Sequence, residues 1–484
     1  MTTRDTLYVG GEWVAPSTSN TIDVISPWTE EVIATVPEAG EADVDRAVEA
    51  AQAALAGPYP RLSADERADW ITKLSGGIGA RAQEFADTIT SEMGSPASWS
   101  LMGQVFSATM VLDSFAELVR TFPFEEQRTG AFGPVLVRKE PVGVAVGIVP
   151  WNVPLFVAML KLGPALAAGA PIILKPSPET PLDGYLLAEV IEEIGLPKGM
   201  VSVLPAGREV GEYMVRHPGV SKVGFTGSTA AGRKVGAICG ELLKRVTLEL
   251  GGKSAAIVLD DADLAAQIPM LMPNAMMNNG EACVAQTRIL APRSRYAEVV
   301  DAVADAVKAT SVGDPTDPSI AVGPLVAERQ RDRVLGYIEK GNAEGAKLAV
   351  GGGRPAGLDK GWFVEPTLFV DVDNKMTIAQ EEIFGPVLSV IPYDSEAEAV
   401  SIANDSDYGL SGSVWTGDVE RGIEVARQVR TGTYGVNAFS TLDLKTPFGG
   451  FKSSGMGREL GPEGLTAYLE TKSIVLPPDY TPPA

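Results

Sequence analysis

The chain carries only two cysteines among its 484 residues, and one of them, Cys283, lies in a setting suited to chemistry. It follows the segment 278–282, Asn-Asn-Gly-Glu-Ala, a turn loosened by glycine, and it precedes an apolar run that starts at Ile289. The thiolate is the strongest nucleophile among natural side chains near neutral pH, so a thiol that a ligand can approach is a candidate nucleophile. This pattern therefore indicates covalent catalysis by sulfur.

A nucleophilic cysteine needs a base, and histidine is a poor candidate for that base here. His217 is the one histidine of the chain, and it lies in a polar segment, 214–218, with no cysteine nearby. A carboxylate or a bound water is the better candidate. Glu249, flanked by Leu248 and Leu250, is expected to face away from these leucines or to be partly buried with a raised pKa. A carboxylate tuned in that way is what a general base near neutral pH requires.

Two loops follow predicted strands and could bind a ligand there. The segment 227–232, Gly-Ser-Thr-Ala-Ala-Gly, lies between a strand and a helix, and the N-terminus of a helix offers free N–H groups to a pyrophosphate. It lacks the G-x-G-x-x-G spacing of the usual dinucleotide-binding turn, so an ordinary βα turn fits it equally well. Lys175 follows another strand at the carboxyl edge of a sheet, where ligands of open α/β sheets bind. Taken alone, a solvated lysine at a strand end is the simpler interpretation.

These residues need a scaffold, and the middle of the chain predicts one in which strands and helices alternate. Its apolar, valine-rich runs suit strands that are buried on both faces. Alternation with helices implies a parallel sheet covered on both faces, the architecture typical of dinucleotide binding. The predicted strands are 142–149, 171–174, 201–204 and 223–226, and the predicted helices are 155–168, 182–194 and 229–243.

A second alternating region predicts a second α/β domain, so the fold class is α/β with a Rossmann-like first domain. Two segments break the alternation: 122–140 is predicted to form an antiparallel hairpin, and 472–476 a single strand. Together they predict a small β extension, and the tail 477–484 is expected to be irregular. In the second domain the predicted strands are 255–259, 287–291 and 383–393, and the predicted helices are 262–272, 294–309 and 396–405.

Composition and charge exclude several classes of protein. A formal net charge of −22 argues against a nucleic-acid partner, because phosphate binding needs clustered lysine and arginine. Two cysteines cannot form a disulfide framework and no secretory signal is visible, so a reduced, cytoplasmic protein is expected. The uncharged stretch 142–160 is long enough to span a membrane, but Pro150 and Pro154 interrupt it. We interpret it as a buried strand, a loop and a helix, and expect no membrane partner.

Seven short motifs occur in the same order in one known family, and they span nearly the whole chain. On these motifs the chain resembles the aldehyde dehydrogenase superfamily of NAD(P)-dependent enzymes, in its non-acylating, broad-specificity bacterial type. Members oxidise aldehydes to carboxylic acids through a cysteine thiohemiacetal. The motifs are Pro150-Trp151-Asn152, Lys175-Pro176-Ser177, Phe225-Thr226-Gly227-Ser228, Leu248-Glu249-Leu250-Gly251-Gly252-Lys253, Gly280-Glu281-Ala282-Cys283, Glu381-Glu382-Ile383-Phe384-Gly385-Pro386, and Pro447-Phe448-Gly449-Gly450-Phe451-Lys452 with Ser454-Gly455.

The resemblance implies three catalytic residues and no metal. Cys283 would attack the aldehyde carbon. The side-chain amide of Asn152 and the backbone N–H of Cys283 would stabilise the oxyanion, and each such donor is typically worth about 3 kcal/mol in the transition state. Glu249 would activate the water that hydrolyses the thioester, which accounts for the missing histidine. Cys239 matches no motif and is expected to be a small buried apolar residue.

The resemblance also implies NAD as the cofactor, with NADP possible. Glu382 would hold the nicotinamide ribose, and Phe384 would pack near the nicotinamide. The other cofactor contacts would come from Gly227, Ser228 and Gly232 to the pyrophosphate, from Trp151 along the cleft, and from Lys175 to the adenosine ribose hydroxyls.

One departure from the family pattern concerns the choice of cofactor. Members that prefer NAD usually carry a glutamate three residues after the lysine, where its carboxylate accepts from the ribose 2′-OH and repels a 2′-phosphate. Here Pro178 occupies that position and Glu179 follows it. Since the segment 176–182 contains no arginine or lysine that would attract a phosphate, NAD stays the expected cofactor and NADP is expected to be usable.

The resemblance further implies three structural parts and a homo-oligomer. Residues 1–122 and 141–250 would form the coenzyme-binding domain, and 251–450 the catalytic domain. Residues 123–140 and 451–484 would form an oligomerisation hairpin and a C-terminal strand that pair across subunits, in a homodimer or a homotetramer.

The segments expected to line the aldehyde tunnel are mostly apolar. They are 156–160, the neighbours of Cys283, and 438–444, and none places an arginine to bind a substrate carboxylate. This favours a neutral, hydrophobic aldehyde, whether aromatic, terpenoid or medium-chain. Three alternatives are less favoured. A CoA-acylating relative would generally lack Glu249, a non-catalytic scaffold of the same fold would be expected to lose Cys283, Asn152 or Glu249, and a cysteine hydrolase would need a nearby histidine.

Overall fold

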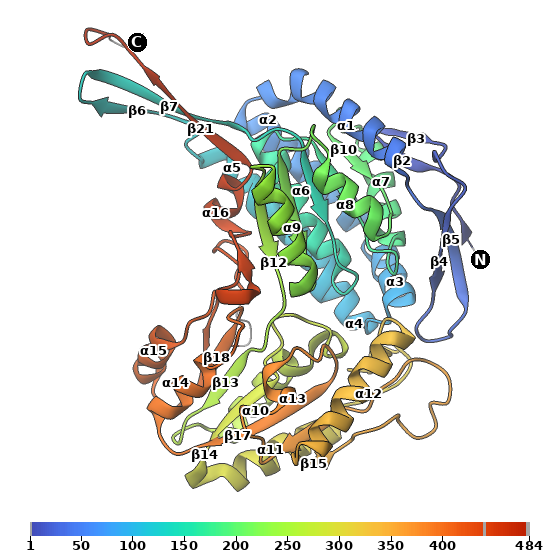
Figure 1. Ribbon diagram of the computed structural model, residues 1–484, viewed down its shortest axis with the longest axis vertical. Helices are drawn as coiled ribbons and strands as arrows, with labels where there is room; N and C mark the ends of the chain where they lie inside the picture. The colour runs from blue at the N-terminus through green and yellow to red at the C-terminus, as the bar shows by residue number, and fades with distance from the viewer. Residues whose placement is uncertain (1, 439–441, 481–484) are drawn as a thin grey trace.

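A computed structural model describes residues 2–438 and 442–480, and these form two α/β lobes with a projecting β arm (Figure 1). Within the described residues, one lobe is built on an eight-stranded sheet and the other on a seven-stranded sheet. The chain leaves the first sheet after Glu249 and rejoins it at a short strand, β20 (Gly455–Met456). The two crossings leave residues from both lobes close to the junction between them.

The first sheet has a parallel centre with antiparallel edges. Its described strands run in the order β20-β12-β11-β8-β9-β10-β2-β3, and the five from β12 to β10 are parallel. Short apolar runs suit these central strands, which helices cover on both faces. The strands are β2 (Leu7–Val9), β3 (Glu12–Val14), β8 (Ala145–Ile148), β9 (Ile172–Lys175), β10 (Val201–Val203), β11 (Lys222–Thr226) and β12 (Arg245–Glu249).

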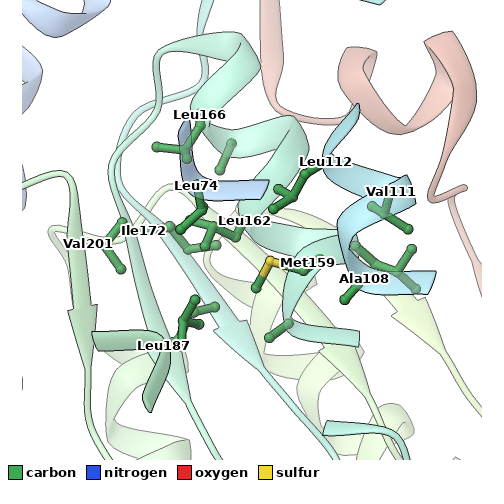
Figure 2. Packing of buried hydrophobic residues seen from close by; sticks show 14 of the residues in the cluster. Leu74, Ala108, Val111, Leu112, Met159, Leu162, Leu166, Ile172, Leu187 and Val201 are labelled. Atoms are coloured by element: carbon green, nitrogen blue, oxygen red, sulfur yellow. The ribbon is translucent and has the colours of Figure 1, made fainter. Parts of the chain in front are cut away.

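Two hydrophobic clusters cover the two faces of this sheet. The larger one centres on α6, a helix that is apolar on every side except at Lys161 and is almost wholly buried, as such a composition predicts. Figure 2 shows Met159 and Leu162 of α6 beside Leu112 of α5, with Ile172 of the sheet close by. The helices of this lobe are α1 (Glu41–Ala56), α2 (Ala64–Ala80), α3 (Ala82–Met93), α4 (Ala97–Trp99), α5 (Ser107–Thr121), α6 (Pro154–Ala168), α7 (Leu182–Glu193), α8 (Arg208–Arg216) and α9 (Thr229–Glu241).

The second sheet repeats the parallel, helix-covered design. Among the described residues its strand order is β15-β16-β17-β14-β13-β18-β19, and only β15 is antiparallel to its neighbour. The strands are β13 (Ala255–Val258), β14 (Arg288–Pro292), β15 (Lys347–Val350), β16 (Thr367–Val370), β17 (Val387–Tyr393), β18 (Gly412–Trp415) and β19 (Gly435–Val436). The helices are α10 (Leu264–Met276), α11 (Tyr296–Ala309), α12 (Glu328–Ala343), α13 (Thr377–Gln380), α14 (Glu396–Asn404) and α15 (Val419–Gln428).

The arm is a three-stranded antiparallel ribbon that stands off the first lobe (Figure 1). Strands β6 (Glu125–Gly130) and β7 (Gly133–Pro141) form a hairpin, and β21 (Leu469–Val475) pairs with residues 135–141 of β7. The apolar side chains of Phe132 and Val475 are 86% and 70% exposed on it. Smaller elements are β1 (Thr2–Thr3), β4 (Thr21–Ile25), β5 (Val32–Pro37) and α16 (Gly461–Thr466).

The structure confirms the predicted α/β class, and each alternating element is present within a few residues of its predicted bounds. The predicted hairpin and C-terminal strand also form, and they pair with each other. One boundary is wrong: the predicted strand 383–393 begins only at Val387, as β17, and residues 383–386 before it form a loop. The uncharged stretch 142–160 is a strand, a loop and a helix as interpreted, and no helix in the described part of the chain could cross a membrane. The end of the predicted irregular tail, 481–484, lies outside the described residues.

Candidate active site

Cys283 lies in a loop whose backbone is held in an unusual conformation. The residues after α10, Asn278, Asn279 and Gly280, have φ angles of 52°, 63° and 75°, a left-handed run that disfavours most side chains. A Cβ added to Gly280 would lie 2.2 Å from the carbonyl carbon of Gly385. The loop therefore packs tightly against the segment that precedes β17.

Glycine also allows the close approach of the Gly251-Gly252 segment to Cys283. A Cβ on Gly252 would come within 2.2 Å of the carbonyl oxygen of Cys283, and one on Gly251 within 2.6 Å of a carboxylate oxygen of Glu382. The backbone N–H of Gly252 donates to Glu382 at 2.9 Å. The structure thus brings together the motifs around Glu249, Cys283 and Glu382, which lie far apart in the sequence.

Asn152 lies at the same junction, in the loop between β8 and α6. Its side chain is 5% exposed, and its Nδ2 donates to the carbonyl oxygen of Glu281 at 2.8 Å. An amide nitrogen has two hydrogens, so a second donor is left on Nδ2. Asn152 is therefore bonded directly to the loop that carries Cys283.

Glu249 is the last residue of β12, and its carboxyl group is buried without a partner. The side chain is 3% exposed, and neither carboxyl oxygen has a hydrogen-bond partner among the described residues. Burial and then the negative charge of Glu459 raise the pKa of Glu249 well above its ordinary value, although Lys161 and Arg458 act to lower it. The predicted burial and raised pKa are both confirmed, in a stronger form than expected.

The thiol of Cys283 is also shifted toward its protonated form. Cys283 is half-buried, and desolvation followed by the charges of Glu382 and Glu249 raises its pKa to about 12. The backbone N–H groups of Cys283 and Val284 act in the opposite direction. Since only the thiolate is strongly nucleophilic, a base in reach of this sulfur is needed at neutral pH. His217 is engaged elsewhere, because its Nε2 lies 3.2 Å from Asp45.

A buried ion pair, which no sequence motif predicted, shifts the pKa of Glu249 through its two charges. Lys161 Nζ donates to Glu459 Oε1 at 2.8 Å and to Thr226 Oγ1 at 2.7 Å. The side chains of Lys161 and Glu459 are 0% and 5% exposed. Lys161 ends an apolar stretch of the sequence and Glu459 lies near the C-terminus. No local sequence pattern could therefore have predicted this pair.

The segment Glu382–Phe384 is held by α12 of the second lobe, which the sequence analysis also missed. Arg333 donates to the carbonyl oxygen of Glu382 at 2.6 Å, and Gln330 donates to that of Phe384 at 2.6 Å. Phe384 has a φ of 65°, and its ring meets the ring of Trp151 edge-on at 5.3 Å. The two predicted cofactor residues Trp151 and Phe384 are therefore in contact across the junction.

The predicted phosphate-binding turn caps α9. Ser228 is the N-cap, and its Oγ accepts from the backbone N–H of Ala231 at 3.3 Å. The first N–H groups of a helix have no partner within the helix. Gly227 donates its N–H to the carbonyl oxygen of Glu249 at 3.0 Å, while a Cβ on Gly232 would lie 2.2 Å from Leu250. Gly232 therefore meets a packing requirement, because α9 approaches the strand end closely there.

Lys175 is not the solvated lysine that its position alone suggests. It is 6% exposed at the end of β9, and its Nζ donates to the carbonyl oxygens of Ala206 at 2.7 Å and Pro176 at 3.0 Å. Burial lowers its pKa to about 8, against the raising effects of Glu179 and Glu38. One of the three ammonium hydrogens is left for a ligand.

The loop after Lys175 contains no arginine or lysine of its own in residues 176–182, but a cation from the second lobe contacts it. Arg329 of α12 pairs with Glu179, although the two residues are 150 positions apart. Glu179 also accepts from the hydroxyl of Ser177. The loop after Lys175 is therefore bound to the second lobe through a carboxylate next to Pro178.

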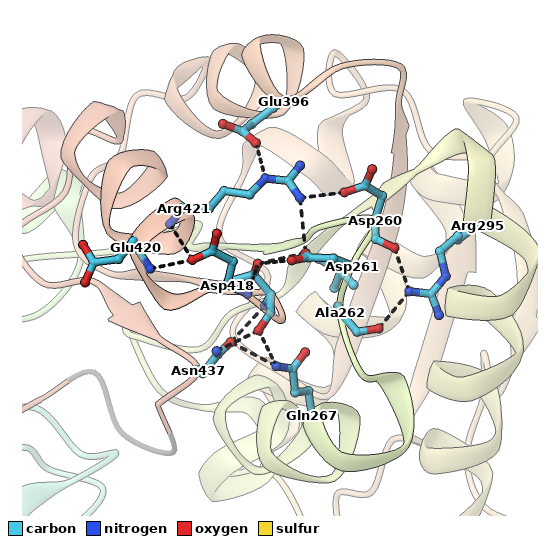
Figure 3. Close-up of polar contacts among 12 residues, drawn as sticks. Asp260, Asp261, Ala262, Gln267, Arg295, Glu396, Asp418, Glu420, Arg421 and Asn437 are labelled. Atoms are coloured by element: carbon cyan, nitrogen blue, oxygen red, sulfur yellow. Dashed lines mark hydrogen bonds and ion pairs between the residues drawn. The ribbon is translucent and has the colours of Figure 1, made fainter.

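A polar network anchors the start of the segment 438–444, which was predicted to line the substrate tunnel (Figure 3). Asn437 has a φ of 50°, and its Oδ1 accepts from the N–H of Thr416 at 2.9 Å and from Gln267 at 3.1 Å. Gln267 belongs to α10, which leads to the Cys283 loop. Residues 439–441 themselves lie outside the described residues.

Comparisons with known proteins agree with this geometry. The Aldehyde dehydrogenase family model matches residues 13–474. Geranial dehydrogenase of Castellaniella defragrans is 48% identical over 474 residues, which cover 97% of this chain and 98% of that protein. The 3-succinoylsemialdehyde-pyridine dehydrogenase of a Pseudomonas species is 42% identical, with coverage of 97% and 98%.

Solved structures give the same result for the fold. An aldehyde dehydrogenase of Mycobacterium tuberculosis, complexed with NAD+, is 52% identical, covers 99% of each chain and superposes with a TM-score of 0.97. A mutant aldehyde dehydrogenase C of Pseudomonas syringae, complexed with NAD+ and octanal, is 41% identical, covers 97% of this chain and 96% of that one, and has a TM-score of 0.94. Matched over nearly its full length in both sequence and fold, this chain belongs to the aldehyde dehydrogenase family.

Proposed function

We propose that this dehydrogenase oxidises a neutral, hydrophobic aldehyde to the carboxylic acid, with NAD as the hydride acceptor. The convergence of Cys283, Glu249 and Asn152 from three separate segments carries the proposal. These residues supply a nucleophile, a base and an oxyanion donor. A CoA-acylating enzyme or a non-catalytic scaffold would not need an unpartnered, buried base at Glu249.

The chemistry of each residue follows from its surroundings. Glu249 receives the thiol proton, and the Cys283 thiolate adds to the aldehyde carbon. The free hydrogen on Asn152 Nδ2 and the backbone N–H of Cys283 stabilise the oxyanion of the thiohemiacetal. The chemistry that NAD supplies when bound is acceptance of the hydride from that carbon. Glu249 releases this proton to solvent and then takes a proton from the water that adds to the thioester, so that the acid forms and the Cys283 thiolate leaves.

The residues of the junction fit a dinucleotide. The uncapped N–H groups at the start of α9 suit a pyrophosphate, and Gly227 and Ser228 lie there. The third hydrogen of Lys175 suits a ribose hydroxyl, and the Glu382 carboxylate suits the hydroxyls of the other ribose. The faces of Trp151 and Phe384 suit a flat ring. The two structural neighbours that carry NAD+ support the same cofactor here.

The substrate class rests on apolar side chains of the segments expected to line the aldehyde tunnel. Phe156, Leu442 and Leu444 pack against the same hydrophobic cluster as the side chain of Cys283. A relative named for geranial and a neighbour that holds octanal support a terpenoid or medium-chain aldehyde. The test is NADH absorbance on mixing the enzyme with geranial, octanal, benzaldehyde and succinic semialdehyde, and a preference for the last would contradict the proposal.

We further propose a cytoplasmic homodimer or homotetramer in which the arm of β6, β7 and β21 pairs across subunits. The coenzyme domain would comprise 1–122 and 141–250, the catalytic domain 251–450, and the oligomerisation elements 123–140 and 451–484. The exposed apolar side chains on the arm support this arrangement, since contact with another subunit would bury them. Light scattering tests it, and a monomer at micromolar concentration would contradict it.

Cofactor choice should respond to the residue after Ser177. With Pro178 no carboxylate repels a 2′-phosphate at that position, and Arg329 partly neutralises Glu179 next to it. We expect NAD to be preferred and NADP to be usable, and Pro178→Glu to widen the preference by about 1–2 kcal/mol, or roughly five- to thirty-fold. The measurement is kcat/KM and the dissociation constant for both cofactors.

Two further variants test whether the charge of Glu179, next to Pro178, contributes to the choice of cofactor. Glu179→Gln removes the one carboxylate that this loop presents there, so it should improve NADP relative to NAD. Arg329→Gln should do the opposite, because the charge of Glu179 is then uncompensated. Rejection of NADP by several orders of magnitude in the wild type, unchanged in Glu179→Gln, would show that another element enforces the choice.

Turnover should rise with pH through the raised pKa of Glu249. A carboxyl acts as a base only when ionised, and burial keeps Glu249 protonated above the ordinary pKa of a glutamate. The kcat of the wild type should therefore increase from weakly acidic to alkaline pH, and Glu249→Gln should lose this limb. Superimposable pH profiles of wild type and variant would show that another group titrates.

A further inference from the structure

Asn278 makes contacts that neither the catalytic proposal nor the motifs account for. It precedes Cys283 in the left-handed run after α10, and its side chain is 2% exposed. Its Nδ2 donates to the carbonyl oxygen of Asn152 at 2.8 Å, and more weakly to that of Glu281 at 3.4 Å. Its Oδ1 accepts from the hydroxyl of Ser95 at 2.8 Å. One buried amide thus joins the nucleophile loop to the loop of the oxyanion donor.

The side chains of Asn278 and Asn152 converge on one carbonyl. Asn152 donates its own Nδ2 to the oxygen of Glu281 at 2.8 Å, the same oxygen that Asn278 approaches. Asn152 is therefore fixed at its main chain by Asn278 and at its amide by Glu281. Because the two hydrogens of an amide nitrogen lie in the amide plane, this bond also sets the direction of the second hydrogen.

We propose that Asn278 is a positioning residue for the oxyanion donor: it locks Asn152 so that the free Nδ2 hydrogen is aimed where charge develops during attack by Cys283. The inference rests on the proposed role of Asn152. Oxyanion stabilisation depends on donors that are oriented before the reaction, so a small rotation of this amide lowers the rate of acylation without moving the sulfur.

The unusual backbone at this position permits a clean variant. Asparagine and glycine both tolerate the left-handed region, so Asn278→Gly removes the amide and keeps the conformation. Asn279→Gly is a matched control at the next residue, whose φ is 63°. The Asn279 side chain bonds to Gly94, Gly323 and Pro324, and none of these bonds involves Asn152.

The experiment measures acylation separately from cofactor binding and thiol access. In rapid mixing with NAD and octanal, the rate of the first NADH turnover should fall roughly ten- to hundred-fold in Asn278→Gly. The dissociation constant of NAD and the rate of Cys283 alkylation by iodoacetamide should stay at wild-type values. Asn279→Gly should show a similar loss of thermal stability with a much smaller loss of rate. Equal rate losses in the two variants would overturn the proposal.

Two further variants keep the outcome interpretable. Asn152→Ala should lower the first-turnover rate by roughly a hundred-fold, and Asn278→Gly should add little to it, since residues that act as a unit are not additive. If Asn152→Ala leaves the rate unchanged, the proposed oxyanion role fails. If Asn152→Ala slows the reaction but Asn278→Gly does not, only the inference about Asn278 fails. Should Asn278→Gly not fold, Ser95→Ala removes the hydroxyl that orients the Asn278 amide, and a wild-type rate there would overturn the inference.

Discussion

Cys283→Ala should abolish aldehyde oxidation while NAD still binds. In the proposed mechanism the sulfur forms the covalent bond on which both half-reactions depend, so its loss should reduce kcat by on the order of 10⁴-fold. Cofactor affinity should persist, because the residues proposed to contact NAD lie on α9, β9 and the segment before β17. NADH formation and a cofactor-binding titration, done on the same preparation, measure the two effects.

The second cysteine provides the control for this variant. Cys239 is 0% exposed on α9, and burial raises the pKa of its thiol, so it behaves as the small apolar residue that was predicted. Cys239→Ala should retain most of the activity. Loss of activity in Cys239→Ala with an intact fold, or turnover in Cys283→Ala, would show that the nucleophile is assigned wrongly.

Glu249→Gln should separate the two half-reactions. The glutamine keeps the size of the side chain but cannot accept a proton from water, so thioester hydrolysis should slow by roughly 10²- to 10⁴-fold. Hydride transfer should slow less, which predicts a burst of NADH of up to one equivalent per active subunit and then slow turnover. Rapid mixing followed over seconds measures both phases.

The same experiment distinguishes two proposed roles of Glu249, activation of the thiol and hydrolysis of the thioester. The proposed mechanism also gives Glu249 an earlier step, in which it takes the proton of the Cys283 thiol, and its charge raises the pKa of that thiol. A slow single phase without a burst would indicate that this earlier step has become limiting. Turnover at the wild-type rate would contradict both roles.

The sequence predicted the strands and helices well where the local pattern was strong. Valine-rich runs bounded by glycine and proline led to β8 and β10, and the helices between them followed from their apolar spacing. It failed at β12, where Arg245, Thr247 and Glu249 interrupt the apolar pattern and the strand forms through pairing with β11. It also failed at residues 383–386, where an apolar composition suits a strand but glycine, proline and α12 hold a loop.

The candidate site was predicted from its motifs. Contacts between residues that lie far apart in the sequence were not predicted. Asn152, Glu249 and Cys283 lie in recognisable motifs, and the structure brings them together. The pairs Arg329–Glu179 and Lys161–Glu459 have no local signal, because each joins residues from different parts of the fold. The burial of Lys175 was missed for the same reason, since the carbonyl oxygen of Ala206 that holds it comes from after the next strand.

The unpartnered carboxyl of Glu249 gives the stability of the fold and the proposed catalysis opposite dependences on pH. Its pKa is raised in the folded protein, so above the ordinary pKa of a glutamate the folded chain binds more protons at this site than the unfolded chain does. The contribution of Glu249 to stability therefore falls as pH rises from there toward the raised pKa. In the proposed mechanism catalysis gains over the same interval, because Glu249 acts as a base only when it is ionised. The proposed base therefore lowers the resistance of the fold to unfolding at the pH values at which it is ionised and reactive.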